Sequence, residues 1–346
     1  MAATFGVLDA IGLFMSGLGI FSFVQHNFLD YVPPGANFRF ALGLNGAGPF
    51  GEGLQNADGT LPDIRVFNAL GDEIGKTIND DTYCKDGVVC DSLVPWVQEQ
   101  PVYTLFTANA DAICIAWVTA TFPEGDKYAW TGNFGRYCPS ATWYYSDIYV
   151  QNDHGADKVA CTWIDKNGDQ PTTGIQVSWP AYASNFNGNG GKADFYCSQG
   201  PALFFHQDQD PWRIKTLPQK RNMFASNPSV EEKAFAPKPK DAKPKKAGYN
   251  EHYVHDTRLV KSHANSHKAS ELCESKTSVG PSFVSYKERK FCHMATKKLH
   301  SFCEDVKTGT CWDDVKHEIV HKDENGAVKR SVNPALPFNK VILWGQ

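Results

Sequence analysis

Residues 112–131, AICIAWVTATFPEGDKYAWT, are the most informative stretch for the fold class of this chain. Ala112–Phe122 and Lys127–Thr131 are rich in β-branched and aromatic residues, and the turn signal Glu124-Gly125 lies between them. This run–turn–run pattern predicts two strands of an antiparallel sheet.

The same texture recurs on both sides of this stretch. Further runs of this kind, separated by Gly, Asn, Asp and Pro clusters, are Asn37–Leu42, Asp63–Phe67, Val102–Thr107, Trp143–Val150, Val159–Ile164 and Gly174–Trp179. No long amphipathic helices alternate with them, which argues against a doubly wound α/β fold. We therefore predict a mainly β protein whose central domain, 35–216, is an antiparallel β-sandwich or jelly roll.

Composition fits a globular protein of this kind. The chain has 346 residues, of which 42% are hydrophobic and 13% aromatic, too many for a wholly disordered protein. At roughly 100–200 residues per domain, this length allows two units or one large unit with an appendage. It excludes a disulfide miniprotein, and the composition excludes a multi-pass membrane protein.

Three other regions flank the sandwich. An apolar, Gly-rich segment, 1–34, is predicted to contain a helix, and a Lys/Pro/His-rich stretch, 217–269, reads as a solvated linker. Residues 270–346 are predicted to form a small, disulfide-stapled helical module. Its expected inward positions are Phe283, Tyr286, Phe291, Met294, Leu299 and Phe302.

The N-terminal segment is a candidate for assembly or anchoring. Ala10–Val24 is uninterrupted by charge, but as a helix it would span about 22 Å, less than the roughly 30 Å hydrocarbon core of a membrane. Its small residues would allow close helix packing. A helix buried against the protein's own core is an equal alternative. The assembly candidates are Gly12, Phe14, Gly17, Gly19, Phe21 and Phe23.

Cysteine usage indicates the compartment. The chain has ten cysteines and no C-x-x-C pair, which favours disulfides over zinc sites. We expect an extracellular or cell-surface protein; free buried thiols in a cytosolic protein are the alternative. The secretory signal would be atypical, since no Lys or Arg precedes Arg39. The pairing is left open for Cys84, Cys90, Cys114, Cys138, Cys161, Cys197, Cys273, Cys292, Cys303 and Cys311.

Charge is distributed unevenly along the chain. Met1–Trp212 contains 9 Lys+Arg and 23 Asp+Glu, whereas Arg213–Gln346 contains 25 and 15. The basic half has no aromatic residues interleaved in its Lys/Pro tract, so nucleic acid is not the favoured partner. Docking on the acidic half of the same chain or of a neighbouring copy is the hypothesis, with a solvated linker as the simpler interpretation of the tract.

Two groups of residues are candidates for chemistry or binding. His317-Glu318-Ile319-Val320-His321 matches the H-E-x-x-H motif, which on a helix binds zinc and supplies a general base. Its charged continuation and the early Asn325-Gly326 argue against that helix. The second group is aromatic and would suit glycan or membrane-lipid binding if exposed, or the core if buried: Trp130, Trp143, Tyr144 and Tyr145.

Several motifs together resemble a group of uncharacterised proteins of filamentous fungi. They are Gly17–Phe23, Asp111–Ala116 with Trp130-Thr131-Gly132, Cys161–Asp165, Ser275–Pro281 and Phe291–Met294. This resemblance carries no assigned activity. The architecture, an apolar N-terminal helix before a sandwich with a Trp-Tyr-Tyr cluster, is also similar to that of actinoporin-type pore formers.

These observations favour a non-enzymatic fungal surface or secreted protein that binds or self-assembles. Its apolar N-terminus would anchor it in an oligomer or a membrane, its main partner would be a second copy, and no cofactor is expected. The alternatives are an actinoporin-like membrane-damaging pore former and a zinc-dependent hydrolase that uses residues 317–321.

Overall fold

The computed structural model describes residues 35–44, 53–54, 56–152, 155–182, 196–197, 202–216, 256–330 and 337–345. The N-terminal segment 1–34, with its predicted helix, lies outside these ranges. The assembly candidates that therefore have no structural description are Gly12, Phe14, Gly17, Gly19, Phe21 and Phe23.

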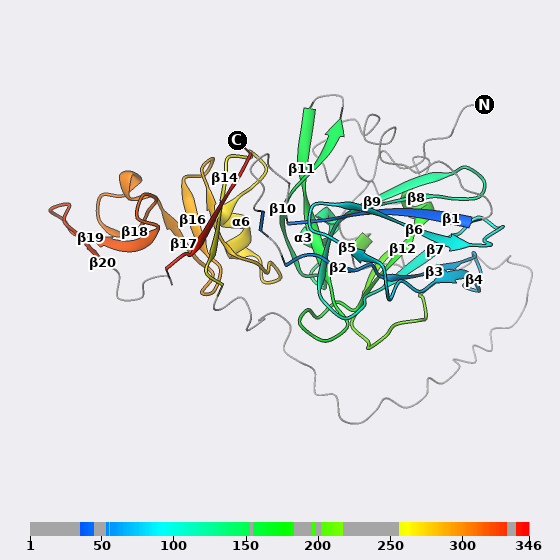
Figure 1. The fold of residues 1–346 in the computed structure, drawn as a ribbon. Coiled ribbons are helices and arrows are strands. Elements are labelled where there is room, and N and C mark those ends of the chain that lie inside the picture. Colours follow the sequence, from blue (N-terminus) through cyan, green and yellow to red (C-terminus); the bar gives the residue numbers. More distant parts are fainter. Residues whose placement is uncertain are drawn as a thin grey trace, which may run out of the picture.

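The described chain is mainly β, as predicted, and its N-terminal part contains two antiparallel sheets (Figure 1). The first sheet has the order β10-β11-β8-β1-β6, and β9 pairs with the second half of β8. Its strands are β1 (Gly35–Leu42), β6 (Val89–Pro95), β8 (Ile113–Thr121), β9 (Lys127–Thr131), β10 (Trp143–Asn152) and β11 (Gly155–Ile164).

The second sheet has the order β13-β12-β7-β3-β4. A short hairpin of β2 (Gly59–Thr60) and β5 (Tyr83–Cys84), the helix α3 (Asn133–Tyr137) and the 3-10 turn η1 (Trp179–Tyr182) flank the two sheets. The strands of the second sheet are β3 (Asp63–Phe67), β4 (Glu73–Thr77), β7 (Tyr103–Thr107), β12 (Gly174–Ser178) and β13 (Leu203–His206).

The two sheets pack face to face around one hydrophobic core. Phe38 and Phe40 of β1 both contact the ring of Phe106 on β7 edge-on, at centroid distances of 5.7 and 5.5 Å. Ile64 and Val177 reach the same cluster from β3 and β12. Alternating strand residues supply this interior, because successive side chains point to opposite faces. The β-sandwich is therefore confirmed.

The C-terminal module consists mostly of strands, which corrects the predicted helical module. One sheet has the order β17-β16-β15-β14-β21, and a smaller one the order β18-β19-β20. The only helices described there are α6 (Ala269–Glu274) and the 3-10 turn η3 (Cys303–Asp305). The strands are β14 (Arg258–Ser262), β15 (Ser282–Ser285), β16 (Lys290–His293), β17 (Lys298–Ser301), β18 (Gly309–Asp313), β19 (Glu318–Lys322), β20 (Val328–Arg330) and β21 (Lys340–Trp344).

The physical reason for this difference is the tight turns between short apolar runs. Phe283 and Phe291 are both fully buried, but they lie on paired strands, β15 and β16, rather than on one helix. Arg289 and Lys297 adopt positive φ angles of 53° in the turns before β16 and β17. The spacings of eight residues between Phe283 and Phe291 and of three residues between Phe291 and Met294 therefore arise from short strands and turns, although they also match a helical period.

The module also begins earlier than predicted. β14 lies inside the range 217–269 that we interpreted as linker, and it pairs in parallel with both β15 and β21. Leu259 and Val260 are buried on its two faces. The five residues Arg258–Ser262 are thus an inner strand of the module's larger sheet, between β15 and β21.

All ten cysteines are paired, which confirms the predicted disulfides. Three bridges lie in the sandwich and two in the module, so none joins the two units. The pairs are Cys84–Cys90, Cys114–Cys161, Cys138–Cys197, Cys273–Cys292 and Cys303–Cys311. Disulfides persist in oxidising compartments, so this result is consistent with an extracellular or secreted protein. None of the described helices has the length and apolar character needed to span a bilayer.

Candidate functional site

The two units meet at a continuous contact that we call the joint. It is formed by Trp143–Tyr145, at the start of β10, and by the segment Ser275–Pro281, which follows α6. In Figure 1, β10 and β11 lie on the side of the sandwich nearest the module. One buried hydrophobic cluster includes side chains of both units, among them Trp163, Leu272 and Trp344.

Backbone hydrogen bonds join the two segments of the joint. The Trp143 N–H donates to the carbonyl of Thr277 at 3.2 Å, and the Val279 N–H donates to the carbonyl of Trp143 at 2.9 Å. The indole N–H of Trp143 donates to Ser275 Oγ at 3.1 Å. A short bridge between strands of two units orients them more firmly than side-chain packing alone, because its geometry is directional.

Two close contacts restrict the side chains that the joint can accommodate at positions 144 and 280. The hydroxyl of Tyr144 donates to the carbonyl of Pro281 at 2.8 Å, and Gly280 lies directly on the Tyr144 ring. A Cβ atom at Gly280 would lie 2.5 Å from that ring, too close for any side chain. The indole of Trp163, on β11, donates to the carbonyl of Val279 at 3.2 Å.

A charged pair closes one side of the joint. The guanidinium of Arg136, on α3, donates to both carboxylate oxygens of Glu271, on α6, and the shortest N···O distance is 2.7 Å. The hydroxyl of Tyr145 donates to the same carboxylate at 2.6 Å. Burial raises the pKa of Tyr145 well above its usual value, so the phenol remains a donor at any physiological pH.

A buried Ser–His pair lies next to these residues. Ser262 Oγ and His267 Nδ1 are 2.9 Å apart, and the imidazole stacks on the ring of Tyr145 at 4.5 Å. Burial lowers the pKa of His267 well below 6.5, so the ring is neutral. Both side chains are enclosed by the surrounding elements. The pair therefore contributes to packing between β14 and β10, and no substrate can reach its hydroxyl in this arrangement.

All four aromatic candidates are buried, so none offers an open face to a glycan or lipid. Trp143, Tyr144 and Tyr145 belong to the joint, and Trp130 stacks on Phe134 inside the sandwich at 6.2 Å. The sequence left open whether these side chains are exposed for binding or belong to the core, and all four belong to the core. β10 is the last strand of its sheet, and the module covers it on the outside, so both faces of Trp143–Tyr145 are enclosed.

The H-E-x-x-H motif lies on a strand and not on a helix. Glu318 and His321 belong to β19, and His317 directly precedes it. Four residues of extended chain span about 13 Å, so the two imidazoles point to separate places and cannot share a zinc ion. Among the residues with a structural description, no group of three or more His, Cys, Asp or Glu side chains could hold a metal ion. His317, Glu318 and His321 therefore lack the helical arrangement in which this motif binds zinc.

His317 instead belongs to a polar cluster that joins the two sheets of the module. Its Nε2 lies 3.1 Å from Nζ of Lys261, on β14, and Lys261 forms an ion pair with Asp314 at 3.0 Å. The hydroxyl of Tyr286 donates to Asp314 at 2.9 Å. Burial and the nearby Lys261 lower the pKa of His317. A neutral imidazole can accept a hydrogen bond from the ammonium, which explains the short contact.

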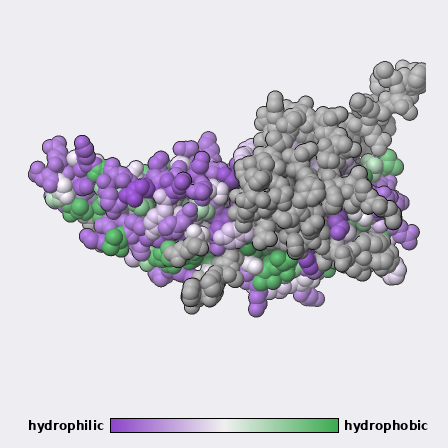
Figure 2. Space-filling model, turned by 90° about the horizontal axis from the view of Figure 1, so that it is seen from above, coloured by the Kyte–Doolittle hydropathy of each residue, from purple (hydrophilic) through white to green (hydrophobic). Residues whose placement is uncertain are grey.

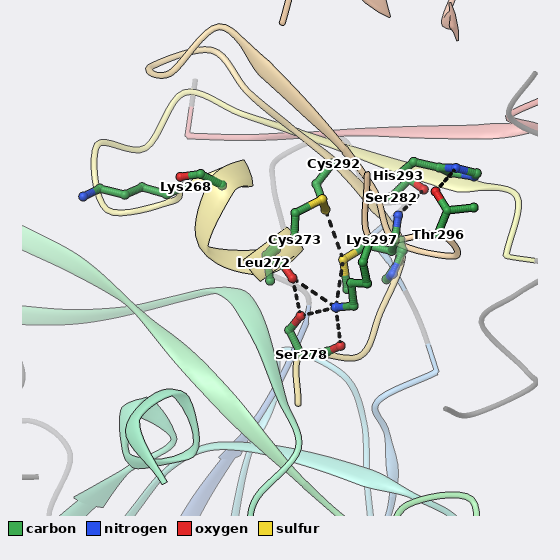
Figure 3. Close-up of a disulfide and its surroundings, with 12 residues drawn as sticks. Lys268, Leu272, Cys273, Ser278, Ser282, Cys292, His293, Thr296 and Lys297 are labelled. Atoms are coloured by element: carbon green, nitrogen blue, oxygen red, sulfur yellow. Dashed lines mark hydrogen bonds between the residues drawn. A yellow bond between two sulfur atoms is a disulfide. The ribbon is translucent and has the colours of Figure 1, made fainter. Parts of the chain in front are cut away.

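A second buried lysine supports the joint from within the module (Figure 3). Nζ of Lys297 donates to the carbonyls of Leu272 and Ser278 at 3.0 and 2.7 Å, and it also contacts the hydroxyl of Ser278. Burial lowers the pKa of Lys297 to about 8. Together with the Cys273–Cys292 disulfide, this ammonium fixes α6 and the start of the joint segment to β16.

Loops of the sandwich bring together an acidic cluster that no sequence motif indicates. The hydroxyl of exposed Tyr83 donates to Asp58, and Asp86 accepts the N–H of Ala57 at 3.0 Å. Burial, followed by the charge of Asp58, raises the pKa of Asp86 to about 7. The exposed Asp111 has a raised pKa for the same two reasons. These aspartates come from separate loops, so no local motif connects them.

This cluster predicts an unusual dependence of stability on pH. Because the folded state binds the Asp86 proton more tightly than the unfolded state does, stability falls as pH rises from about 4 to 7. Asp86→Asn removes the buried charge. After a discount for partial exposure, we expect it to stabilise the protein by about 1–2 kcal/mol above pH 7 and by almost nothing at pH 4. Urea unfolding at both pH values measures the difference, and equal effects at the two values would contradict the assignment.

Comparison with known proteins adds no identification. No protein-family model matches this chain, and no curated protein is significantly similar to it. The function is therefore inferred from the side chains and surfaces described above.

Proposed function

We propose that this chain is a secreted, non-catalytic protein that self-assembles, and that its resemblance to proteins of filamentous fungi places it at a fungal surface. The observation that carries this proposal is an exposed apolar row on β6 and the turn after it. The row consists of Val89, Leu93 and Trp96, and Trp96 is 75% exposed. Asp91, which lies between Val89 and Leu93 on the same face, forms an ion pair with Arg39. Exposed large apolar side chains that lie together are typical of interaction sites.

The position of this row supports a link with the apolar N-terminus. Gly35, the first described residue after the segment 1–34, pairs with Pro95 and packs against the side chain of Leu93. The chain therefore leaves the predicted assembly segment beside the exposed row.

The contacts of the potential catalytic groups also support a non-catalytic role. The Ser262–His267 pair is enclosed, and the ammonium groups of Lys261 and Lys297 each bind oxygen atoms of neighbouring turns. A nucleophile or general base must reach a substrate, and these groups are already used to join elements. Five disulfides and a bonded joint suit a rigid component outside the cell.

Light scattering after size exclusion tests the proposal with the full chain. Wild type is expected to have a mass above that of one chain, with the fraction assembled rising with concentration. The double variant Leu93→Glu, Trp96→Glu should weaken association by at least about tenfold, because it removes two apolar anchors. Leu70→Glu is the control, since Leu70 is a leucine in the β3–β4 turn that is even more exposed than Leu93, at 68% against 39%.

Two outcomes would overturn this function. A wild type that is monomeric at every concentration excludes self-assembly, and release of dye from liposomes by the wild type would favour the pore-forming alternative. The control variant must keep the wild-type mass. If Leu70→Glu dissociates the protein as strongly as the double variant, the row on β6 is not the contact.

A further inference from the structure

The outer edge of the module's larger sheet has the features of a second assembly contact. Among the described residues, β21 pairs only with β14, so its other edge has no strand partner. An edge strand presents a row of N–H and C=O groups that can pair with another chain. Val341 and Leu343 on this strand are 38% and 50% exposed, while Ile342 and Trp344 are buried.

Three other edge strands in the described parts of the chain carry exposed charges that discourage such pairing. β4 has Glu73 and Lys76, β17 has Lys298, and β20 has Lys329, all of them exposed. The single charge on β21 is Lys340, and its ammonium donates to the carbonyl of Gly53 at 2.6 Å. β21 therefore has neither an outward charge nor a proline, the two usual protections of a sheet edge.

Figure 2 shows mostly hydrophilic residues over one face of the C-terminal module, with small hydrophobic patches between them. In the register of β14 and β21, Val341 lies opposite Leu259 and Leu343 lies opposite Lys261. Both therefore share the face of the sheet on which Leu259 belongs to the core between the module's sheets. Pairing with another strand would extend that core, which is the usual source of specificity in strand addition.

We propose that β21 pairs antiparallel with β21 of a second copy of this chain, so that two five-stranded sheets become one. This inference rests on the proposed self-assembly and assigns it a second contact, in the unit that does not carry the β6 row. The strand is self-complementary: with Ile342 on the two-fold axis, Val341 faces Leu343 of the partner subunit on the same face of the sheet. Such two-fold contacts are the most common in homo-oligomers.

Charge also favours a second copy in this register. Lys340 lies opposite Trp344 of the partner subunit, so the two Lys340 ammonium groups are about 13 Å apart and repel each other only weakly. The parallel register would instead place the two lysines side by side. A contact of five residues buries little area, so we expect weak, concentration-dependent association.

A charge-complementation experiment tests the pairing. One full-length variant carries Val341→Lys and Leu343→Lys, and another carries Val341→Glu and Leu343→Glu. Each alone should associate at least a hundredfold more weakly than wild type, because like charges then face each other across the axis. An equimolar mixture should regain association, since every new lysine faces a glutamate of the partner. Val328→Lys, on the exposed edge strand β20, is the matched control and should behave as wild type.

The mixture separates a lost contact from a damaged fold. A misfolded variant would not recover on mixing, and circular dichroism of each variant gives a second measurement of folding. If both variants keep the wild-type mass, or if the folded variants remain separate after mixing, the β21 contact is wrong while the proposed self-assembly stands. If wild type itself is monomeric throughout, the proposed function fails with it.

Discussion

Trp143→Ala is expected to lower the free energy of unfolding by about 3–5 kcal/mol, the cost of removing a large, fully buried aromatic side chain. The indole fills the joint between the sandwich and the module, donates to Ser275 and contacts the ring of Tyr145 edge-on at 5.3 Å. Its loss leaves a cavity between two units that no disulfide connects. The guanidinium of Arg136, 5.6 Å from the indole, would also lose the ring that covers it.

Urea unfolding measures the stability loss, and brief trypsin digestion reports the joint itself. Lys276 is exposed in the segment that Trp143 holds, so cleavage after this residue should accelerate in the variant. Trp96→Ala is the control: its indole is exposed, and the expected change is within about 0.5 kcal/mol. A loss below about 1 kcal/mol in Trp143→Ala, with unchanged cleavage, would mean that the joint does not contribute to the stability of the fold.

The sandwich could be predicted because each of its central strands either is apolar on both faces or alternates apolar and polar residues. All eight runs named from the sequence correspond to strands, and Asp63–Phe67 and Lys127–Thr131 match β3 and β9 in full. The strands that were missed lack this signal. β4 is EIGKT, which is too polar to indicate a strand, and β6 contains Asp91 and Pro95. Their positions at sheet edges explain both compositions, since edge strands need only one neighbour.

The joint could not be predicted, because its parts are far apart in sequence. Trp143 and Thr277 are separated by 134 residues, and nothing local indicates that their backbones are bonded. Two of the motifs that resemble the fungal proteins do contain a contact of the joint. Trp163, in Cys161–Asp165, donates to the carbonyl of Val279, in Ser275–Pro281. Aromatic residues that looked like a binding surface are enclosed because a second unit covers them, and burial by another unit leaves no periodic signature in a single sequence.

The C-terminal module was misinterpreted for a different reason. Apolar residues at Phe283, Phe291, Met294 and Phe302 are buried as predicted, but they lie on or next to three short strands, β15, β16 and β17. Strands of four or five residues joined by tight turns produce apolar spacings that overlap with a helical period. The same ambiguity affects His317 and His321, whose spacing has a chemical meaning only on a helix.

Removal of the Cys114–Cys161 disulfide by alanine substitution of both residues is expected to destabilise the protein by about 4 kcal/mol. The bridge closes a loop of 47 residues, and loop-closure entropy for that length gives this value at room temperature. Cys84–Cys90 closes only six residues, so the matched double alanine variant should lose about half as much. Urea unfolding gives both values, and intact mass under non-reducing conditions verifies that four bridges remain in each variant.

The Cys114–Cys161 bridge is expected to stabilise the fold through packing as well as through loop-closure entropy, because of its position. The bridge joins adjacent strands β8 and β11, and Cys161 lies opposite Tyr144 in the register of β10 and β11. Both sulfur atoms belong to the cluster that also contains the aromatic side chains of the joint. Alanine at these positions leaves a void beneath Tyr144, so cleavage by trypsin after Lys276 should also accelerate in this variant and not in the Cys84–Cys90 variant. Equal losses in the two variants, with no change in cleavage, would show that neither loop length nor this location determines the contribution of the bridge.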